Sequence, residues 1–297
     1  MPPVPHELLQ QVKGIALRTR GVVDSLFSGE FRSVFRGQGM EFAEVRAYEQ
    51  GDDFRAIDWN VSARLGSPYV KTFTEERELT VLLVVDQSGS TRVGAPVTKA
   101  SRSVEVAAVL ALAGVREQDR VGAVLFSDRI EHVVPPAKSR RHALRLIRDL
   151  LAFTAAHRGT DLVRAITFAS KVLGHRSVVV LLSDFLAEGW ERPLRQLAAR
   201  HEVIAITVDD PNDRNPPAAG WIEVEDAESG RRSLVDSAAE SARRRWRAAA
   251  EARHHTRAER IKAAGAEHIS IDVTTDYGLV LRRAFARRAG RRGVRRR

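Results

Sequence analysis

The chain contains no cysteine, so it can form neither a disulfide bond nor a thiolate nucleophile or metal ligand. No apolar run approaches the roughly 18 residues that a membrane-spanning helix requires. The opening residues, Met1-Pro-Pro-Val-Pro-His-Glu, lack the pattern of a signal peptide. The sequence also has no Walker A loop, which argues against an ATP site of that type. We therefore expect a cytoplasmic protein without a membrane span.

Acidic residues are missing after Asp276, whereas nine arginines follow it and account for most of the formal net charge of +10. Such a segment could contact the phosphates of nucleic acid or an anionic membrane surface. Between Arg282 and Arg297 the one aromatic residue is Phe285, so stacking on bases is not indicated. We expect a solvated basic tail at residues 289–297, with nucleic-acid contact possible only through these arginines.

The rest of the composition is that of a folded protein. Of the 297 residues 43% are hydrophobic, which suits one α/β domain of about 200 residues and a smaller unit. Strands are expected at residues 81–85, 121–126, 130–134, 178–184, 203–208 and 268–273, with a hairpin at residues 221–235. Helix-like segments alternate with them, and right-handed crossovers then give a parallel sheet. We predict an α/β fold with a doubly wound, mainly parallel sheet and helices on both faces.

One of these strands leads into a run of oxygen-bearing side chains. Residues 81–85 are apolar without alternation, as in a strand buried on both faces, and Asp86, Ser88 and Ser90 follow. In open α/β sheets ligands gather beyond the carboxyl ends of the strands, where these oxygens can converge. A hard divalent cation such as Mg²⁺ prefers about six oxygen ligands. We interpret the loop as part of a cation site.

Two later segments supply further oxygens. Thr160 lies where a helical pattern with Leu162 and Ile166 begins, and Asp184 ends a second buried strand. The alternative interpretation is structural, because Asp86 and Asp184 could cap turns while the serines satisfy backbone groups. Three concordant pieces favour the cation site.

In this order, a strand-end Asp-x-Ser-x-Ser, a Gly-Thr before a helix and another strand-end Asp resemble the metal-ion-dependent adhesion site of von Willebrand factor A domains. The resemblance implies that Ser88, Ser90 and Thr160 ligate Mg²⁺ or Mn²⁺ through their hydroxyls. Asp86 and Asp184 would bind the ion directly or through water. It also implies an open coordination place for a Glu or Asp of a protein partner. The metal would serve recognition, and no catalysis is expected.

A second segment, residues 46–64, reads RAYEQGDDFRAIDWNVSAR. It resembles the signature of bacterial family fifty-eight of the domains of unknown function, whose A-type domain follows directly. Members look like companions of MoxR-type AAA+ ATPases, which implies an adaptor for such an ATPase or its client. Many members carry transmembrane helices before the signature, and this chain lacks them. We expect an N-terminal extension with the signature at residues 1–78, a von Willebrand factor A-like domain at 79–288 and the tail at 289–297.

The acids of the signature have two interpretations. Asp52, Asp53 and Asp58 could form a second metal or catalytic cluster. Turn formation and salt bridges are the favoured interpretation, because Gly51-Asp52-Asp53 is a strong turn signal and arginines alternate with the acids.

A different function class also fits part of the pattern. Magnesium-dependent phosphotransferases of the haloacid dehalogenase type begin with a strand that ends in Asp and carry later acids, which Asp209 and Asp210 could represent. That chemistry generally needs a second Asp two residues after the nucleophile as general acid. Ser88 occupies this place, so the phosphotransferase is the alternative and the adaptor the leading hypothesis.

Overall fold

The computed structural model describes residues 6–27, 41–74, 79–92, 97–155, 157–215, 217–225 and 231–294. The chain divides into two units, one formed by residues 1–34 together with 80–297 and one by residues 35–79. Each is described by itself below.

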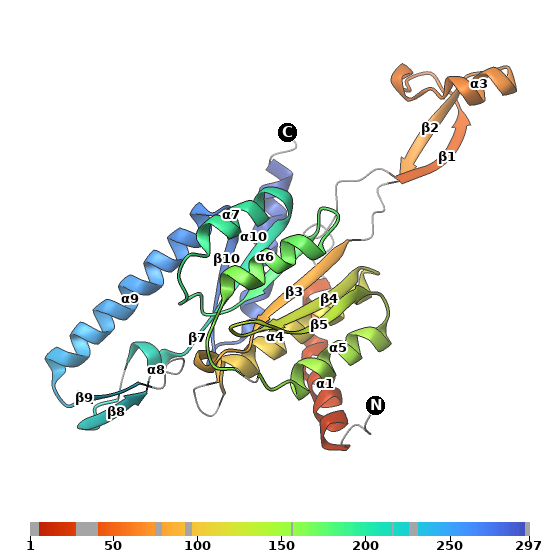
Figure 1. Ribbon diagram of the computed structural model, residues 1–297. Helices are drawn as coiled ribbons and strands as arrows, with labels where there is room; N and C mark the ends of the chain where they lie inside the picture. The colour runs from red at the N-terminus through yellow and green to blue at the C-terminus, as the bar shows by residue number, and fades with distance from the viewer. Residues whose placement is uncertain are drawn as a thin grey trace. The chain divides into compact units, whose positions relative to one another are not determined.

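The larger unit contains the predicted sheet (Figure 1). Its elements are α1 (His6–Phe27), β3 (Thr80–Asp86), η2 (Gly89–Thr91), α4 (Lys99–Arg116), β4 (Arg120–Phe126), β5 (Ile130–Ala137), α5 (Arg140–Ala152), α6 (Leu162–Val172), β6 (Val178–Leu182), α7 (Glu191–Arg200), β7 (Glu202–Asp209), α8 (Pro211–Arg214), β8 (Trp221–Glu225), β9 (Arg232–Asp236), α9 (Glu240–Ala263), β10 (Glu267–Asp272) and α10 (Tyr277–Val294). In the described residues the main sheet has the order β10-β7-β6-β3-β4-β5. All neighbours pair in parallel except β5, which is antiparallel to β4 at the edge. The predicted mainly parallel sheet is confirmed.

Strand β3 lies in the middle of this sheet and is buried along almost its whole length. Because side chains alternate across a strand, Leu82 and Val84 point to one face and Val81, Leu83 and Val85 to the other. The first face packs in a core cluster with residues of α6 and α7. The second is covered by α4, which also packs against α1 and α5. Both faces are therefore covered, as the unbroken apolar run predicts.

Two of the helices that cover the second face begin at capping residues. Thr98 caps α4 by accepting a hydrogen bond from the Ser101 amide at 3.0 Å. Ser139 caps α5 through the His142 amide at 3.2 Å. Each cap satisfies a backbone donor that would otherwise lack a helical partner, which fixes where the helix starts.

Helix α1, which falls within the expected N-terminal extension, belongs to the larger unit. It packs against α4, α5 and α10, and Val12, Ile15 and Val23 on its inner face are at most 6% exposed. The apolar stripe of α1 provides the physical reason, because it is buried only by packing on neighbouring helices. The expected extension, residues 1–78, is thus shared between the two units.

The smaller unit is a hairpin of β1 (Glu41–Ala47) and β2 (Tyr69–Thr74) with η1 (Phe54–Ala56) and α3 (Trp59–Leu65) between them. Arg46 donates to both carboxylate oxygens of Asp52, at 2.8 and 2.7 Å. Asp53 caps η1, and Asp58 caps α3 and pairs with Lys71 at 3.1 Å. The three acids therefore serve turns and ion pairs, as favoured from the sequence.

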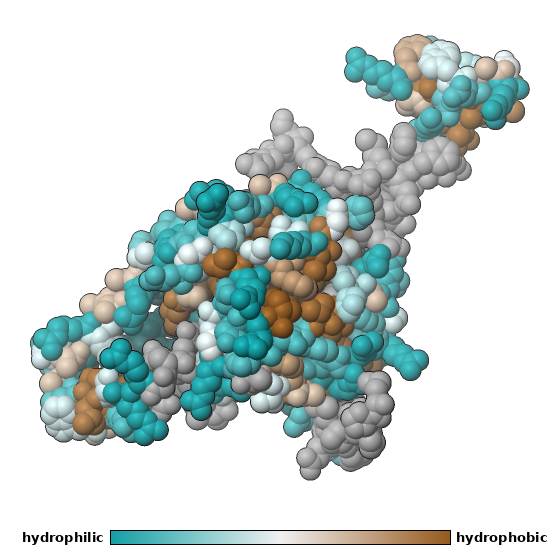
Figure 2. Space-filling model, viewed as in Figure 1, coloured by the Kyte–Doolittle hydropathy of each residue, from teal (hydrophilic) through white to brown (hydrophobic). Residues whose placement is uncertain are grey.

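The C-terminal part of the chain adds a hairpin and two helices to the larger unit. Strands β8 and β9 pair antiparallel, which confirms the predicted hairpin. On the visible face hydrophilic residues cover most of α9, whereas apolar residues gather in the middle of the unit (Figure 2). Helix α10 begins after Asp276, which accepts from the Gly278 amide at 2.9 Å. In the described residues no helix is long and apolar enough to cross a bilayer.

Helix α10 continues to Val294 and so includes most of the expected tail, residues 289–297. Arg295, Arg296 and Arg297 lie outside the described residues. Just before the expected tail, Arg288 is 8% exposed and pairs with Glu202 and Glu267. Arg288 is therefore held in the larger unit by ion pairs with two carboxylates.

Candidate metal centre

The first predicted loop places its oxygens at the carboxyl end of β3. Asp86 and Ser88 are fully buried, and Ser90 is partly buried. The Ser88 amide donates to Asp86 Oδ1 at 2.9 Å, and the hydroxyl oxygens of Ser88 and Ser90 lie 3.1 Å apart. The tight turn at Gly89–Thr91 therefore turns two hydroxyls toward each other beside a strand-end carboxylate.

The loop that carries Thr160 is joined to this first loop. The Gly89 amide donates to the carbonyl oxygen of Arg158 at 2.7 Å, and the Asp161 amide donates to the carbonyl of Ser127 at 2.8 Å. Helix α6 is capped by Asp161, which accepts from the Arg164 amide, so Thr160 lies one residue before the cap. The structure thus brings the loop of Thr160 to the carboxyl ends of β3 and β4.

Asp184 follows β6, the neighbour of β3, and is 3% exposed. Its Oδ1 accepts from the Leu186 amide at 3.2 Å. Its Oδ2 is buried and has no hydrogen-bond partner among the described residues; the Lys99 ammonium lies 3.7 Å away, at ion-pair distance. A buried carboxylate oxygen without a hydrogen bond is costly, so this atom is suited to a cation.

The backbone directly after Asp184 is strained. Phe185 has φ 53°, in the left-handed region that residues other than glycine rarely adopt. The residue is 3% exposed, and its ring packs edge-on against that of the fully buried Trp190, with ring centroids 5.2 Å apart. This packing holds a conformation that costs about 1–3 kcal/mol, and such strain is concentrated at functional sites.

The two acids of the site are electrostatically coupled. Burial and the neighbouring Asp184 carboxylate raise the pKa of Asp86 to about 7, although hydrogen bonds from Ser183 and Ser88 oppose the shift. The Ser183 hydroxyl donates to Asp86 Oδ2 at 2.6 Å. Two carboxylates in one buried place repel each other, and a divalent cation is the partner that would offset this repulsion.

The residues present fit a hard divalent cation. The donor set consists of oxygens alone, with hydroxyls beside two carboxylates and one carboxylate oxygen that lacks a hydrogen bond. Among the described residues no group of three or more His, Cys, Asp or Glu could hold a metal ion. A metal at this place would therefore depend on the hydroxyls of Ser88, Ser90 and Thr160 as well as on the acids.

Sequence reasoning missed three residues that shape this site. Ser183 holds Asp86, Lys99 faces Asp184, and the 7% exposed Arg257 donates to the Asp184 carbonyl at 2.7 Å. Lys99 had a signal in the sequence, because it directly follows the capping residue Thr98. A cation at a helix N-terminus is disfavoured by the helix dipole unless carboxylates face it.

Arg257 also reaches a second polar network at the end of β7. It donates to Asp209 Oδ1 at 2.7 Å, and His254 Nε2 and Ser270 Oγ each lie 3.1 Å from Asp209 Oδ2. Burial opposes the charge on Asp209, but Arg257 and His254 outweigh it and hold the pKa of this carboxyl below its ordinary value. His268 contacts the network through the Thr207 hydroxyl at 3.0 Å.

His268 should make the protein less stable in mild acid. Burial, and then the charges of Arg257 and His254, lower the pKa of His268 to about 4. An unfolded histidine titrates near 6.5, so between these values the unfolded chain binds more protons and the free energy of unfolding falls as the pH drops. We expect His268→Gln to remove the fall in the free energy of unfolding that comes from this histidine. Urea unfolding at several pH values measures the free energy of unfolding.

The exposed His255 provides the matched control for this prediction. His255→Gln should leave the slope of stability against pH unchanged. An identical slope in wild type and His268→Gln would contradict the assignment to His268.

The acids required by the phosphotransferase alternative have structural partners here. Asp209 pairs with Arg257 at 2.7 Å, and Asp210 caps α8 through the Asn212 amide at 2.8 Å. Two residues after Asp86 stands Ser88, which cannot act as the general acid of that chemistry. Neither feature supports a phosphotransferase.

Residues 44–257 match the family described as "Protein of unknown function DUF58", and the chain belongs to this family. Among its relatives is Uncharacterized protein Rv1480 of Mycobacterium tuberculosis (strain ATCC 25618 / H37Rv), which is 34% identical over 291 residues. That alignment covers 96% of this chain and 91% of the relative. Uncharacterized protein MAV169 of Mycobacterium avium is 41% identical over 99 residues, which are 32% of this chain and 59% of the relative. The predicted family membership is confirmed.

Similar solved structures include the conserved hypothetical protein BatB from Bacteroides thetaiotaomicron, at 12% identity and a TM-score of 0.49, covering 71% of this chain and 99% of that one. The VWA domain of SpRpn10 matches at 12% identity and a TM-score of 0.39, covering 69% and 94%. The strand order of this chain defines its fold. Its parallel sheet with one antiparallel edge strand is von Willebrand factor A-like, as predicted.

Proposed function

We propose that this protein is a non-enzymatic adaptor that binds an acidic side chain of a protein partner at a divalent cation. Asp86, Ser88, Ser90, Thr160 and Asp184 would hold Mg²⁺ or Mn²⁺. The observation that carries the proposal is the pair of buried carboxylates, Asp86 and Asp184, beside two hydroxyls 3.1 Å apart.

The charge balance of the site supports recognition of an acid. When bound, the cation supplies a Lewis-acidic centre, and the neutral hydroxyls leave part of its charge uncompensated. Lys99 and Arg257 are 5% and 7% exposed, and each is already paired with a carboxylate, Lys99 with Asp213 at 2.8 Å and Arg257 with Asp209 at 2.7 Å. The open coordination place of the cation itself would therefore attract the partner carboxylate.

The partner that we propose is a MoxR-type AAA+ ATPase or the client of such an ATPase. This part of the proposal follows from the resemblance of residues 46–64 to a family whose members look like companions of such ATPases, and residues 44–257 match that family. A cytoplasmic location agrees with such a partner and stays a prediction.

Affinity capture tests the function. The immobilised full chain should retain a partner from a lysate of the native host in Mg²⁺, release it in chelator and retain it again when Mg²⁺ is restored. Ser90→Ala should weaken capture by roughly tenfold, through loss of one charge-assisted contact. Ser241→Ala, on the exposed side of α9, is the matched control. An AAA+ ATPase in the eluate supports the proposed partner, whereas equal capture in chelator contradicts the role of the metal.

A further inference from the structure

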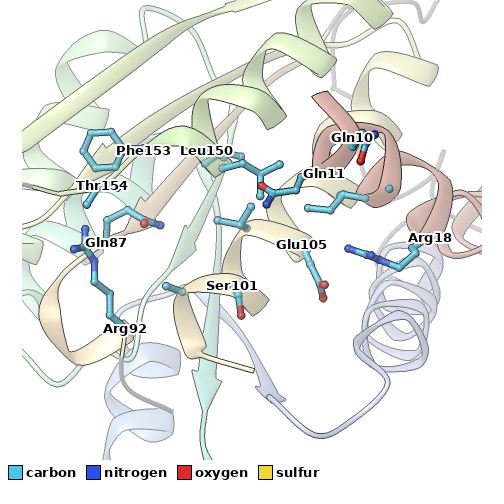
Figure 3. Close-up of a pocket in the computed structure, with 15 residues that line it drawn as sticks. Gln10, Gln11, Arg18, Gln87, Arg92, Ser101, Glu105, Leu150, Phe153 and Thr154 are labelled. Carbon is cyan, nitrogen blue, oxygen red and sulfur yellow. The ribbon is translucent and has the colours of Figure 1, made fainter. Parts of the chain in front are cut away.

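A cavity of about 940 Å³ lies between α1, α4 and α5, beside the loop that follows β3 (Figure 3). Gln87, Arg92 and Thr154 stand together at one end, and Gln11, Glu105 and Arg18 at the other. Apolar side chains, among them Ile15, Val104 and Leu150, line it as well. Its volume lies in the range of sites that bind small molecules.

Gln87 presents a hydrogen-bond donor to this cavity. The residue is 4% exposed, and its Nε2 has no hydrogen-bond partner among the described residues. In Figure 3 its side chain extends from the β3 loop into the cavity. A buried donor left unpaired costs about 1–3 kcal/mol, so a ligand that accepts this bond would be favoured.

Arg92 supplies positive charge at the same end. Its Nη2 donates to the Ala155 carbonyl at 3.3 Å, and a guanidinium has further N–H donors. At the other end Glu105 accepts from Arg102 at 2.8 Å, so its charge is already paired. The end of the cavity at Gln87 and Arg92 thus matches a carboxylate, for which amide and guanidinium groups are complementary donors.

We infer that this cavity is a binding site for an aliphatic carboxylate. The carboxylate contacts Gln87 and Arg92, and the aliphatic part lies along Val104 and Leu150. Such a group can come from a free medium-chain acid or from a peptide with an acidic residue beside leucine. The inference does not depend on the metal centre.

Calorimetric titration of the full chain in chelator tests this site. The probes are octanoate and the peptide acetyl-Ala-Leu-Leu-Glu-amide, with octanol as a probe that lacks the charge. At least one carboxylate probe should bind, and octanol should bind more weakly. Arg92→Gln should raise the dissociation constant of the carboxylate probe by about tenfold or more, through loss of a charge-assisted hydrogen bond. Arg20→Gln, on the exposed side of α1, is the matched control.

Two further variants separate binding from folding. Gln87→Leu should weaken binding while leaving the ligand-free protein at least as stable, because a buried amide whose Nε2 has no hydrogen-bond partner is replaced by an apolar group. Ala100→Leu places bulk in the cavity from a partly exposed position of α4 and should block both probes. The binding probe identifies the source of the carboxylate. Failure of both probes at millimolar concentration, or equal binding by Ala100→Leu, overturns the inference.

Discussion

Replacing Asp86 with asparagine is expected to abolish stabilisation by Mg²⁺ and leave the metal-free protein at least as stable as wild type. Burial and the Asp184 carboxylate raise the pKa of Asp86 to about 7, so above this pH the ionised form is held in an unfavourable environment. The neutral amide removes this repulsion and keeps an oxygen for the Ser88 amide. It also removes one of the two charges that a cation would need.

Thermal unfolding with and without Mg²⁺, at about pH 8, measures both effects. At an ion concentration of 100 times the dissociation constant, the wild type should gain about 2.7 kcal/mol. In a chain of this size that gain corresponds to a rise in Tm of roughly 5–10 °C. Asp210→Asn is the matched control, because Asp210 is a buried strand-end acid whose capping role asparagine can keep. A full Mg²⁺ shift in Asp86→Asn would contradict the account.

Replacing Lys99 with methionine is expected to make the fold depend on the metal. Its ammonium lies 2.8 Å from Asp213 Oδ2 and 3.7 Å from Asp184 Oδ2. Burial opposes its charge, but the Asp184 and Asp213 carboxylates outweigh burial and raise the pKa of Lys99, so it is a cation at neutral pH. Asp213 is 53% exposed and can be solvated, whereas Asp184 would be left as an uncompensated buried acid. Removing one partner of a buried pair costs about 3–5 kcal/mol.

The same change should strengthen Mg²⁺ binding, because Lys99 repels a cation at Asp184. We expect an affinity gain of about tenfold, equivalent to about 1.4 kcal/mol. Calorimetry gives the affinity, and urea unfolding in chelator gives the metal-free stability. Lys171→Met, at an exposed position of α6, should change neither quantity. Unchanged Mg²⁺ affinity in Lys99→Met would show that Lys99 does not face the bound ion.

The fold was predictable because its strands carry strong local signals. The unbroken apolar run at β3 identifies a strand that is buried on both faces. Asp86 and Asp184 mark the carboxyl ends of β3 and β6, which are neighbours in the sheet. Thr98, Ser139 and Asp276 mark helix starts by capping chemistry that acts within a few residues. These patterns arise from contacts between residues that are close in the sequence, so a single sequence is enough to predict them.

The parts that were missed depend on contacts between distant segments. Lys99 and Asp184 are separated by 85 positions in the sequence, yet their charged atoms lie 3.7 Å apart. Arg257 reaches the carbonyl of Asp184 from α9, and α1 packs on α4 and α5. Periodicity shows that α1 has an apolar face but does not show which surface that face covers. Such partners become known only from the tertiary structure.

The most direct test of the central claim is a crystal structure of the full chain with Mn²⁺, in which anomalous scattering locates the ion. The account predicts one strong peak bounded by the hydroxyls of Ser88, Ser90 and Thr160, with Asp86 and Asp184 bound directly or through water. An absence of anomalous signal at this place in well-ordered crystals that contain abundant Mn²⁺ would contradict the account.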